Sequence, residues 1–167
     1  MPYAADQRKG FTLVELLLSI AIIGVLAAVI VTAINPAKQL GDTRNAQRRS
    51  DINALLNAVW QFALDHNASM PCHLGGTGPC IDTVVRMLGL ATTGCSAAGL
   101  CSDATVGADS CLDLAGPLAP TYIFAIPQDP QGSADRTRYV IQAAAGNRVR
   151  ITACDLEGED EVLSATR

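Results

Sequence analysis

An uncharged apolar stretch that follows a single glutamate is the strongest constraint on how this chain can fold. From Leu16 to Ile34 there are 19 residues without a charged side chain. As a helix rising about 1.5 Å per residue, this stretch would cover roughly 28 Å, close to the hydrocarbon thickness of a bilayer. Glu15 directly precedes it, and an ionised carboxylate in that setting costs on the order of 3 kcal/mol. The sequence therefore predicts a membrane-spanning helix with one acidic residue that needs a positive partner.

A short motif surrounds this glutamate. Arg8 and Lys9 lead into the run Gly10-Phe11-Thr12-Leu13-Val14-Glu15-Leu16. The run resembles the class III signal of type IV pilins and of the pseudopilins of type II secretion, and the resemblance continues closely through Asn35-Pro36. In those families a prepilin peptidase cuts after the glycine and the new N-terminal phenylalanine is N-methylated. The resemblance implies that Gly10 ends a leader peptide and that Phe11 is the first mature residue, carrying the methyl group.

Cleavage at this site would also supply the positive charge that Glu15 needs. The new α-ammonium group of Phe11 would lie about one helical turn from Glu15 within one subunit. Between staggered helices of a filament, the amine of one copy could instead meet Glu15 of its neighbour. In a low dielectric such a pair attracts strongly and fixes the register of the helices. We therefore expect Glu15 and Phe11 to act in assembly; the alternative is that Glu15 reaches water at the headgroup level.

Two other interpretations of the N-terminus fit less well. A secretory signal peptide has an apolar core of about 7–15 residues, shorter than the run observed, which Glu15 also interrupts at its start. A plain membrane anchor remains open, because basic residues both precede and follow the span and give no clear orientation.

The helix is expected to continue beyond the membrane. Apolar residues recur at spacings of three and four at Ile52, Leu55, Leu56, Val59, Phe62 and Ala63, typical of an amphipathic helix. We predict one helical element from about Phe11 to Asn67. Pro36 should kink or break it, because proline lacks a donor and clashes with the preceding turn, and Gly24 should loosen it midway.

A cysteine-rich segment follows. All six cysteines lie outside the apolar run, and with an export signal they indicate three disulfides in an oxidising compartment: Cys72, Cys80, Cys95, Cys101, Cys111 and Cys154. Short loops favour Cys72–Cys80 and Cys95–Cys101, which leaves Cys111–Cys154, although spacing does not determine connectivity. Asp82 is expected to cap a short helix that runs to Leu88 and ends at Gly89.

Three strands are predicted near the C-terminus. Residues 121–126, 139–143 and 149–154 are rich in β-branched and aromatic residues, and the last run alternates apolar with polar side chains. Gly146-Asn147 should form the turn of an antiparallel hairpin between the second and third strands.

These elements define an α+β fold. A long, partly transmembrane N-terminal helix packs on a small antiparallel sheet, with a disulfide-rich loop between them, which is similar to the layout of pilins. The expected segments are a leader (1–10), a transmembrane or filament-core helix (11–35), the amphipathic second half of the helix (36–69), the cysteine-rich region (70–120), and the sheet with the C-terminal loop (121–167).

Signals for catalysis and for metal binding are sparse. The chain contains no Walker A, Gly-x-Ser-x-Gly or His-Glu-x-x-His motif, so we expect no enzymatic activity and no cofactor. An acidic run near the C-terminus is a weak candidate for calcium, which some pseudopilins bind near their C-terminal loops; its members are Asp155, Glu157, Glu159 and Asp160. The commoner role of such a run is an exposed acidic loop.

The resemblance implies a filament subunit. The expected partners are further copies of the chain, prepilin peptidase, an assembly platform protein and its ATPase. The expected location is the inner (cytoplasmic) membrane before assembly and an extracellular filament afterwards. A net charge of −4 argues against non-specific binding of nucleic acid. The primary prediction is a pilin of a surface filament; the alternatives are a pseudopilin or minor pilin of a secretion or DNA-uptake machine, and a membrane-anchored extracellular binding domain or enzyme.

Overall fold

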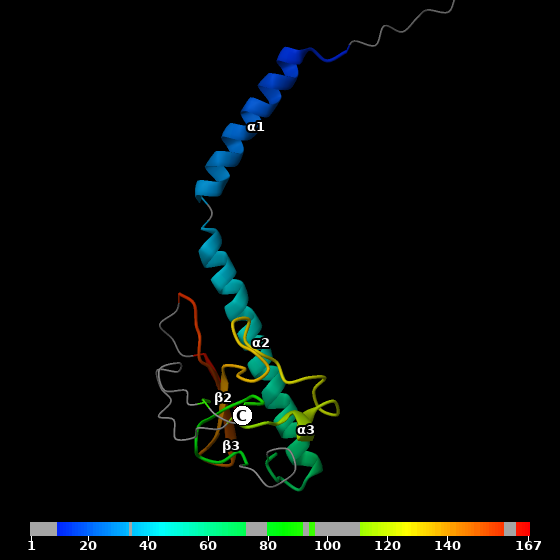
Figure 1. The fold of residues 1–167 in the computed structure, drawn as a ribbon, viewed down its shortest axis with the longest axis vertical. Coiled ribbons are helices and arrows are strands. Elements are labelled where there is room, and N and C mark those ends of the chain that lie inside the picture. Colours follow the sequence, from blue (N-terminus) through cyan, green and yellow to red (C-terminus); the bar gives the residue numbers. More distant parts are fainter. Residues whose placement is uncertain (1–9, 34, 73–79, 92–93, 96–110, 159–162) are drawn as a thin grey trace, which may run out of the picture. The chain divides into compact units, whose positions relative to one another are not determined.

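The fold was analysed in a computed structural model. It describes residues 10–33, 35–72, 80–91, 94–95, 111–158 and 163–167. The chain divides into two compact units, Met1–Gln39 and Leu40–Arg167, and each is treated separately below. Figure 1 shows the order of the elements along the chain.

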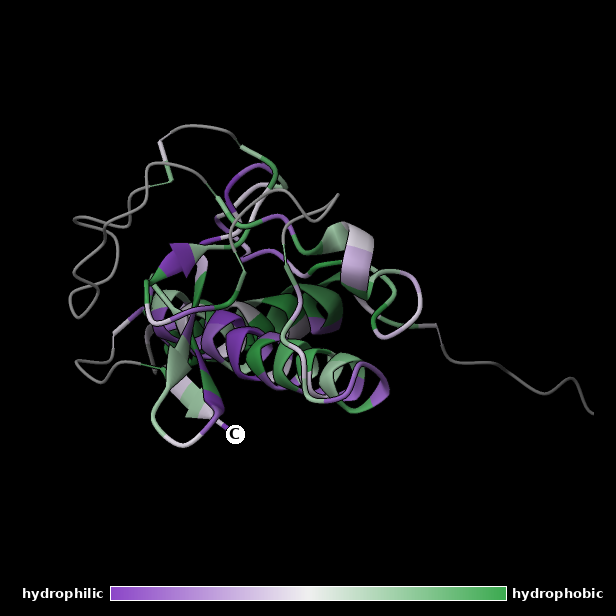
Figure 2. Ribbon diagram, turned by 90° about the horizontal axis from the view of Figure 1, so that it is seen from below, coloured by the Kyte–Doolittle hydropathy of each residue, from purple (hydrophilic) through white to green (hydrophobic). Residues whose placement is uncertain are grey.

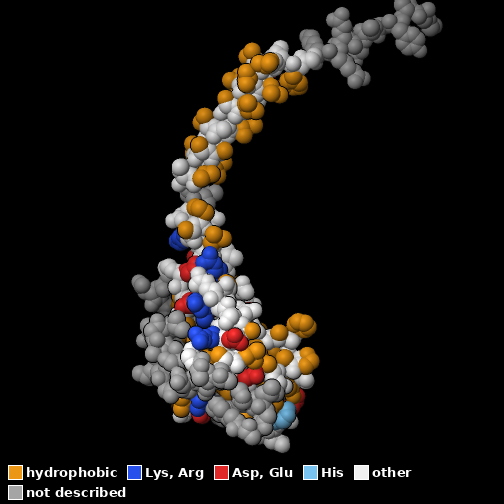
Figure 3. All heavy atoms as spheres, in the orientation of Figure 1, with side chains coloured by type: hydrophobic (Ala, Val, Ile, Leu, Met, Phe, Trp, Pro, Cys, Tyr) orange, Lys and Arg blue, Asp and Glu red, His pale blue; other side chains and the backbone are white. Residues whose placement is uncertain are grey.

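The first unit is built on helix α1 (Leu13–Ala33), which follows directly from the apolar run. Its large side chains are exposed, and apolar side chains cover the face of the helix seen in Figure 3. Within the described residues, this is the one helix long and apolar enough to cross a membrane. Gly24 lies inside the helix without interrupting it.

Helix α2 (Pro36–Asp65) is separate from α1, so the helical element predicted from about Phe11 to Asn67 is divided before Pro36, where a kink or break was predicted. The side chain of Asn35 accepts a hydrogen bond from the Lys38 backbone N–H at 3.2 Å and caps the new helix, with Pro36 in its first position. Asparagine at this cap and proline next to it are the preferred residues for starting a helix. At the other end, Asn67 and Ala68 adopt positive φ angles of 53° and 62°, which end the helical path.

The second unit contains a four-stranded antiparallel sheet in the order β1-β2-β3-β4. Its strands are β1 (Arg86–Met87), β2 (Tyr139–Ala144), β3 (Arg148–Ala153) and β4 (Ser164–Thr166). The predicted hairpin is confirmed: β2 pairs with β3, and Gly146 and Asn147 in the turn have φ angles of 77° and 56°. Positive φ at these positions is what tight hairpin turns require.

One face of α2 forms the core with the sheet. Ile52, Leu55 and Val59 are almost fully buried, and they pack in one cluster with residues of β2 and β3 such as Ile141 and Ile151. Figure 2 shows both apolar and polar residues on the helix turns that lie beside the strands. The amphipathic spacing in the sequence thus identified the buried face correctly.

The strand predicted at residues 121–126 is wrong. The chain forms a short helix α3 (Ala115–Leu118) and then turns back, so that the backbone N–H groups of Tyr122 and Ile123 both donate to the carbonyl oxygen of Leu118. Tyr122 and Ile123 still pack against the core. The other large side chain, Phe124, is 92% exposed, so the β-branched and aromatic composition of this segment neither formed a strand nor marked a fully buried run.

The helix predicted from Asp82 to Leu88 is also wrong. Asp82 does accept a backbone hydrogen bond, from Val84 at 2.8 Å, but this forms a local turn before β1. Gly89 has a φ of 155°, and a Cβ atom there would lie 2.1 Å from the carbonyl oxygen of Asp135. Glycine at this position permits close approach of two backbone segments and does not end a helix.

The disulfides confirm one predicted pair and overturn the others. Cys72 pairs with Cys80 as expected, whereas Cys95 pairs with Cys111 across a sequence separation of 16. Cys154 is also disulfide-bonded, and Cys101 lies outside the described residues. The predicted Cys95–Cys101 and Cys111–Cys154 pairs are wrong because the chain returns beside β1 at residues 111–112, where the Cys111 N–H donates to Ala91.

This pairing can be tested directly. Proteolysis without reduction is expected to yield a linked peptide pair that contains Cys95 and Cys111. Since the bridge closes a loop of about 15 residues, removing it by substituting both cysteines with serine should cost about 3 kcal/mol of unfolding free energy. Substitution of only one cysteine serves as a control for thiol exchange, and a Cys95–Cys101 peptide would contradict the structure.

The cysteine-rich region and the sheet are less separate than expected. Strand β1 lies within residues 70–120, and that region also supplies Leu112, Leu114 and Leu118 to the core. The segment therefore contributes to the hydrophobic core in addition to its disulfides.

Candidate assembly site

The start of α1 is organised around Glu15 and Thr12. The carboxylate of Glu15 accepts hydrogen bonds from the Thr12 backbone N–H at 2.9 Å and from the Thr12 hydroxyl at 3.0 Å. In return, the Glu15 N–H donates to the Thr12 hydroxyl oxygen at 3.2 Å. This reciprocal arrangement is a capping box, in which two otherwise unpaired N–H groups at a helix start are satisfied.

The capping box also stabilises the negative charge of Glu15. Hydrogen bonds from Thr12 stabilise the charged form of the carboxylate, which is also favoured near the positive N-terminal end of a helix. Part of the cost of placing Glu15 at the membrane is therefore offset within a single subunit. An amine from a neighbouring copy would complete the neutralisation, but it is not required for the helix to form.

The other polar side chains of α1 are satisfied internally. The Ser19 hydroxyl donates to the carbonyl oxygen of Glu15 at 2.7 Å, and the Thr32 hydroxyl donates to that of Val29 at 2.9 Å. Within α1, Glu15 is thus the one charged side chain.

Sequence reasoning placed Gly10, Phe11 and Glu15 at this site but missed Thr12. Gly10 and Phe11 precede the helix, and the side chain of Phe11 is 90% exposed. The role of Thr12 could have been found from the spacing Thr-x-x-Glu before an apolar run, which is the sequence signature of a capping box.

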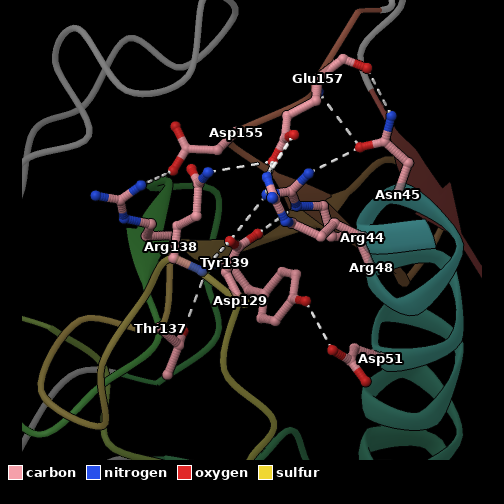
Figure 4. A network of polar contacts seen from close by, with 11 residues as sticks. Arg44, Asn45, Arg48, Asp51, Asp129, Thr137, Arg138, Tyr139, Asp155 and Glu157 are labelled. Atoms are coloured by element: carbon pink, nitrogen blue, oxygen red, sulfur yellow. Dashed lines mark hydrogen bonds and ion pairs between the residues drawn. The ribbon is translucent and has the colours of Figure 1, made fainter. Parts of the chain in front are cut away.

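A second polar cluster lies inside the other unit, where Arg48 of α2 meets Asp129 (Figure 4). Both side chains have zero exposure. The guanidinium group donates from Nε to Oδ2 at 2.5 Å and from Nη2 to Oδ1 at 3.0 Å, a two-point pairing. Asn45 accepts a further hydrogen bond from Arg48 at 2.8 Å. Asp129 lies in the run Pro127-Gln128-Asp129-Pro130, so this pair ties the loop before β2 to the helix.

Tyr139 extends the cluster to a second carboxylate, that of Asp51. Its hydroxyl donates to Asp51 at 2.8 Å, and its side chain has no exposure. Burial, followed by the hydrogen bond to Asp51 and the charge of that group, raises the pKa of Tyr139 well above its usual value. Burial also raises the pKa of Asp51, against the opposing effect of the hydrogen bond from Tyr139.

Alkaline pH should expose the contribution of Tyr139. The pKa of Tyr139 is higher in the folded state than in the unfolded state. Its contribution to the free energy of unfolding is therefore fully present below the ordinary tyrosine pKa of about 10 and is lost as pH rises above that value. Tyr139→Phe should lower the unfolding free energy by about 1–3 kcal/mol at pH 8, since Asp51 loses its donor. In Tyr139→Phe, the decrease in unfolding free energy between pH 8 and pH 11 should be smaller than in the wild type. Denaturant titrations read by the fluorescence of Trp60 measure both; an equal decrease in both proteins would contradict this account.

The calcium candidates are engaged in ion pairs. Asp155 pairs with Arg138, and Glu157 pairs with Arg44, while Glu159 and Asp160 lie outside the described residues. In the part of the chain that the structure describes, no three His, Cys, Asp or Glu side chains form a group that could hold a metal ion.

Comparison with known proteins identifies the class defined by the N-terminal geometry. Residues 6–31 match the family described as the prokaryotic N-terminal methylation motif. The chain is thus a protein with a prepilin-type N-terminus. Together with the relatives described next, this match supports the resemblance to type IV pilins and type II secretion pseudopilins.

Two curated relatives carry the same name. The type II secretion system core protein G of Escherichia coli (strain K12) is 42% identical over 64 residues, which cover 38% of this chain and 43% of that protein. The protein of that name from Aeromonas hydrophila is 39% identical over 61 residues, which cover 36% and 41%. The matches therefore span about two fifths of the relatives' length. No solved structure matched the chain.

Proposed function

We propose that this chain is a structural, non-catalytic subunit of a helical filament that assembles through α1. The observation that carries the proposal is an exposed apolar helix whose one charged residue lies at its first turn. Such a helix is stable in a bilayer, and it would be equally well accommodated in a bundle of like helices. Transfer of α1 from the lipid bilayer to a bundle of like helices would cost little free energy, because both environments are apolar.

In the assembled state, Glu15 would pair with the α-ammonium group of Phe11 from a neighbouring copy. Each carboxylate accepts one such partner, and the pairing is possible only when adjacent helices are staggered by a defined amount. The charge pair would thereby select one register among many apolar contacts that are otherwise similar. Thr12 would hold the Glu15 carboxylate in position for this contact.

Between the two kinds of filament, the relatives favour a pseudopilin of a type II secretion system over the surface pilus predicted first. The subunit would then be stored in the inner membrane and assemble into a filament of the secretion machine. Prepilin peptidase, a platform protein and an ATPase would be its partners.

Processing is tested by mass spectrometry of the mature protein. The expected N-terminal residue is N-methylphenylalanine at position 11, with residues 1–10 removed. Gly10→Val should block cleavage and leave an unmethylated precursor, while Lys9→Arg should be processed normally because it keeps the leader basic. An intact Met1 in the wild-type protein, or cleavage after the apolar run, would refute a prepilin.

Deletion of the gene separates the functional alternatives. Loss of secreted proteins from the medium, with normal surface pili, would support the pseudopilin. Loss of pili with normal secretion would support the surface filament. Normal results in both assays, with the protein remaining monomeric in the membrane, would favour an anchored binding domain or enzyme and would refute the proposal.

A further inference from the structure

The loop after β3 is fastened to α2 through Glu157. Arg44 donates from Nη1 to both carboxylate oxygens of Glu157, with the contact to Oε2 at 2.5 Å. Gln131 donates to Oε1 at 3.1 Å, and the Nη2 atom of Arg48 lies 3.7 Å from the same oxygen. Figure 4 shows these groups converging from α2 and from the Asp129 loop.

The backbone of Glu157 is held as well. Asn45 donates from its side-chain amide to the carbonyl oxygen of Glu157 at 2.9 Å and accepts from the Glu157 N–H at 3.3 Å. One amide side chain thus satisfies both backbone groups of a single residue, as a paired strand would. The contact therefore depends on backbone position as well as on charge.

Gly41 makes room for this contact. A Cβ atom at Gly41 would lie 3.2 Å from the Cβ of Glu157 and 3.3 Å from its Oε2 atom, closer than ordinary packing distance. Glycine inside a helix costs about 1 kcal/mol relative to alanine, so its presence here has a packing explanation. Gly41, Arg44, Asn45 and Arg48 recur at helical spacing and form one receiving face.

Among the described residues around Glu157, the arginines and carboxylates are paired with one another. Three guanidinium groups pair with three carboxylates: Arg44 with Glu157, Arg48 with Asp129, and Arg138 with Asp155. A divalent cation bound by Asp155 and Glu157 would have to displace arginines from both and would then lie near uncompensated positive charge. The described residues therefore do not fit the calcium site that the family resemblance implied.

We propose that an arginine–carboxylate lock, centred on Arg44, Asn45 and Glu157, fastens the C-terminal loop to α2 in place of a bound calcium ion. The lock makes the position of this loop independent of divalent cations. It predicts that the loop is released by removing charge from either partner and is unaffected by chelation.

Hydrogen–deuterium exchange of the full-length protein in detergent tests the lock. The exchange rate of peptides covering residues 154–158 is expected to change less than twofold between 5 mM calcium and excess EDTA. Glu157→Gln and Arg44→Gln should each accelerate exchange of these peptides at least tenfold. Asp42→Asn, which removes an exposed carboxylate from the same helix, should leave the rate unchanged.

Two results would overturn the proposal. Slowing of exchange in the wild type by calcium, with loss of the effect in Glu157→Gln, would establish a cation site. Exchange in Glu157→Gln and Arg44→Gln no faster than in Asp42→Asn would show that the ion pair does not hold the loop. Unfolding of a variant is recognised by faster exchange in the β2–β3 peptides. The charge-removing variant of the other partner then decides the test, and Arg44→Lys, which keeps the charge, should exchange more slowly than Arg44→Gln.

Discussion

Glu15→Ala is expected to leave the chain in the membrane but to reduce filament assembly at least tenfold. Removing the carboxylate makes α1 more apolar, so insertion is unaffected or improved. In the filament, the Phe11 ammonium group would be left without a partner in an apolar bundle. Breaking one side of a buried ion pair costs about 3–5 kcal/mol, enough to abolish a register-selecting contact. Sheared filaments and membrane fractions, quantified by immunoblot, measure the two quantities separately.

Two further variants distinguish the charge of Glu15 from its capping role. Glu15→Gln can still accept hydrogen bonds from Thr12 but carries no charge, so it should assemble as poorly as the alanine variant. Thr12→Val keeps the charge but loses the hydroxyl of the capping box, which typically costs about 1 kcal/mol. It should therefore assemble with a moderate defect. Normal assembly of Glu15→Gln would mean that Glu15 supports assembly through the capping box and forms no ion pair between subunits.

Arg48→Ala is expected to produce the largest loss of stability. The substitution leaves the fully buried carboxylate of Asp129 without its partner. The expected cost is about 3–5 kcal/mol, or roughly 10–20 °C in the melting temperature of a unit of this size. Thermal unfolding followed by the fluorescence of Trp60 measures the shift in the full-length protein.

The double variant Arg48→Met with Asp129→Leu is the matched control. Replacing both members of a buried ion pair with apolar residues is often neutral or stabilising, because no charge then remains to be desolvated. We expect it to recover most of the stability lost in the single variant. A single variant as stable as the wild type would show that the pair is not buried in solution.

The sequence predicted those features that depend on local pattern. The uncharged run gave α1, the spacing of Ile52, Leu55 and Val59 gave the core face of α2, and Gly146-Asn147 gave the hairpin turn. Each of these signals lies within a few residues of the structure it produces. The methylation motif matched by residues 6–31 belongs to the same group.

Features that depend on contacts between distant parts of the chain could not be predicted from local sequence patterns. Arg48 and Asp129 are separated by 81 positions, and nothing in either neighbourhood indicates a buried pair. Residues 121–126 have the composition of a strand, but they form turns, with Tyr122 and Ile123 packed against the core and Phe124 exposed. Cys95 pairs with Cys111 because β1 brings the chain back beside Leu112, whereas short spacing favoured Cys101. In each case tertiary packing decided between conformations that local preference could not separate.

The central claim is that an ion pair between copies of this chain sets the register of the filament. An electron cryo-microscopy reconstruction of the filament at side-chain resolution tests it most directly. The account predicts the Phe11 amine of one copy within about 4 Å of the Glu15 carboxylate of a neighbour, the distance of an ion pair. A Glu15 side chain bonded to Thr12 alone, with every neighbouring Phe11 amine more than about 8 Å away and beyond the reach of a direct pair, would contradict it.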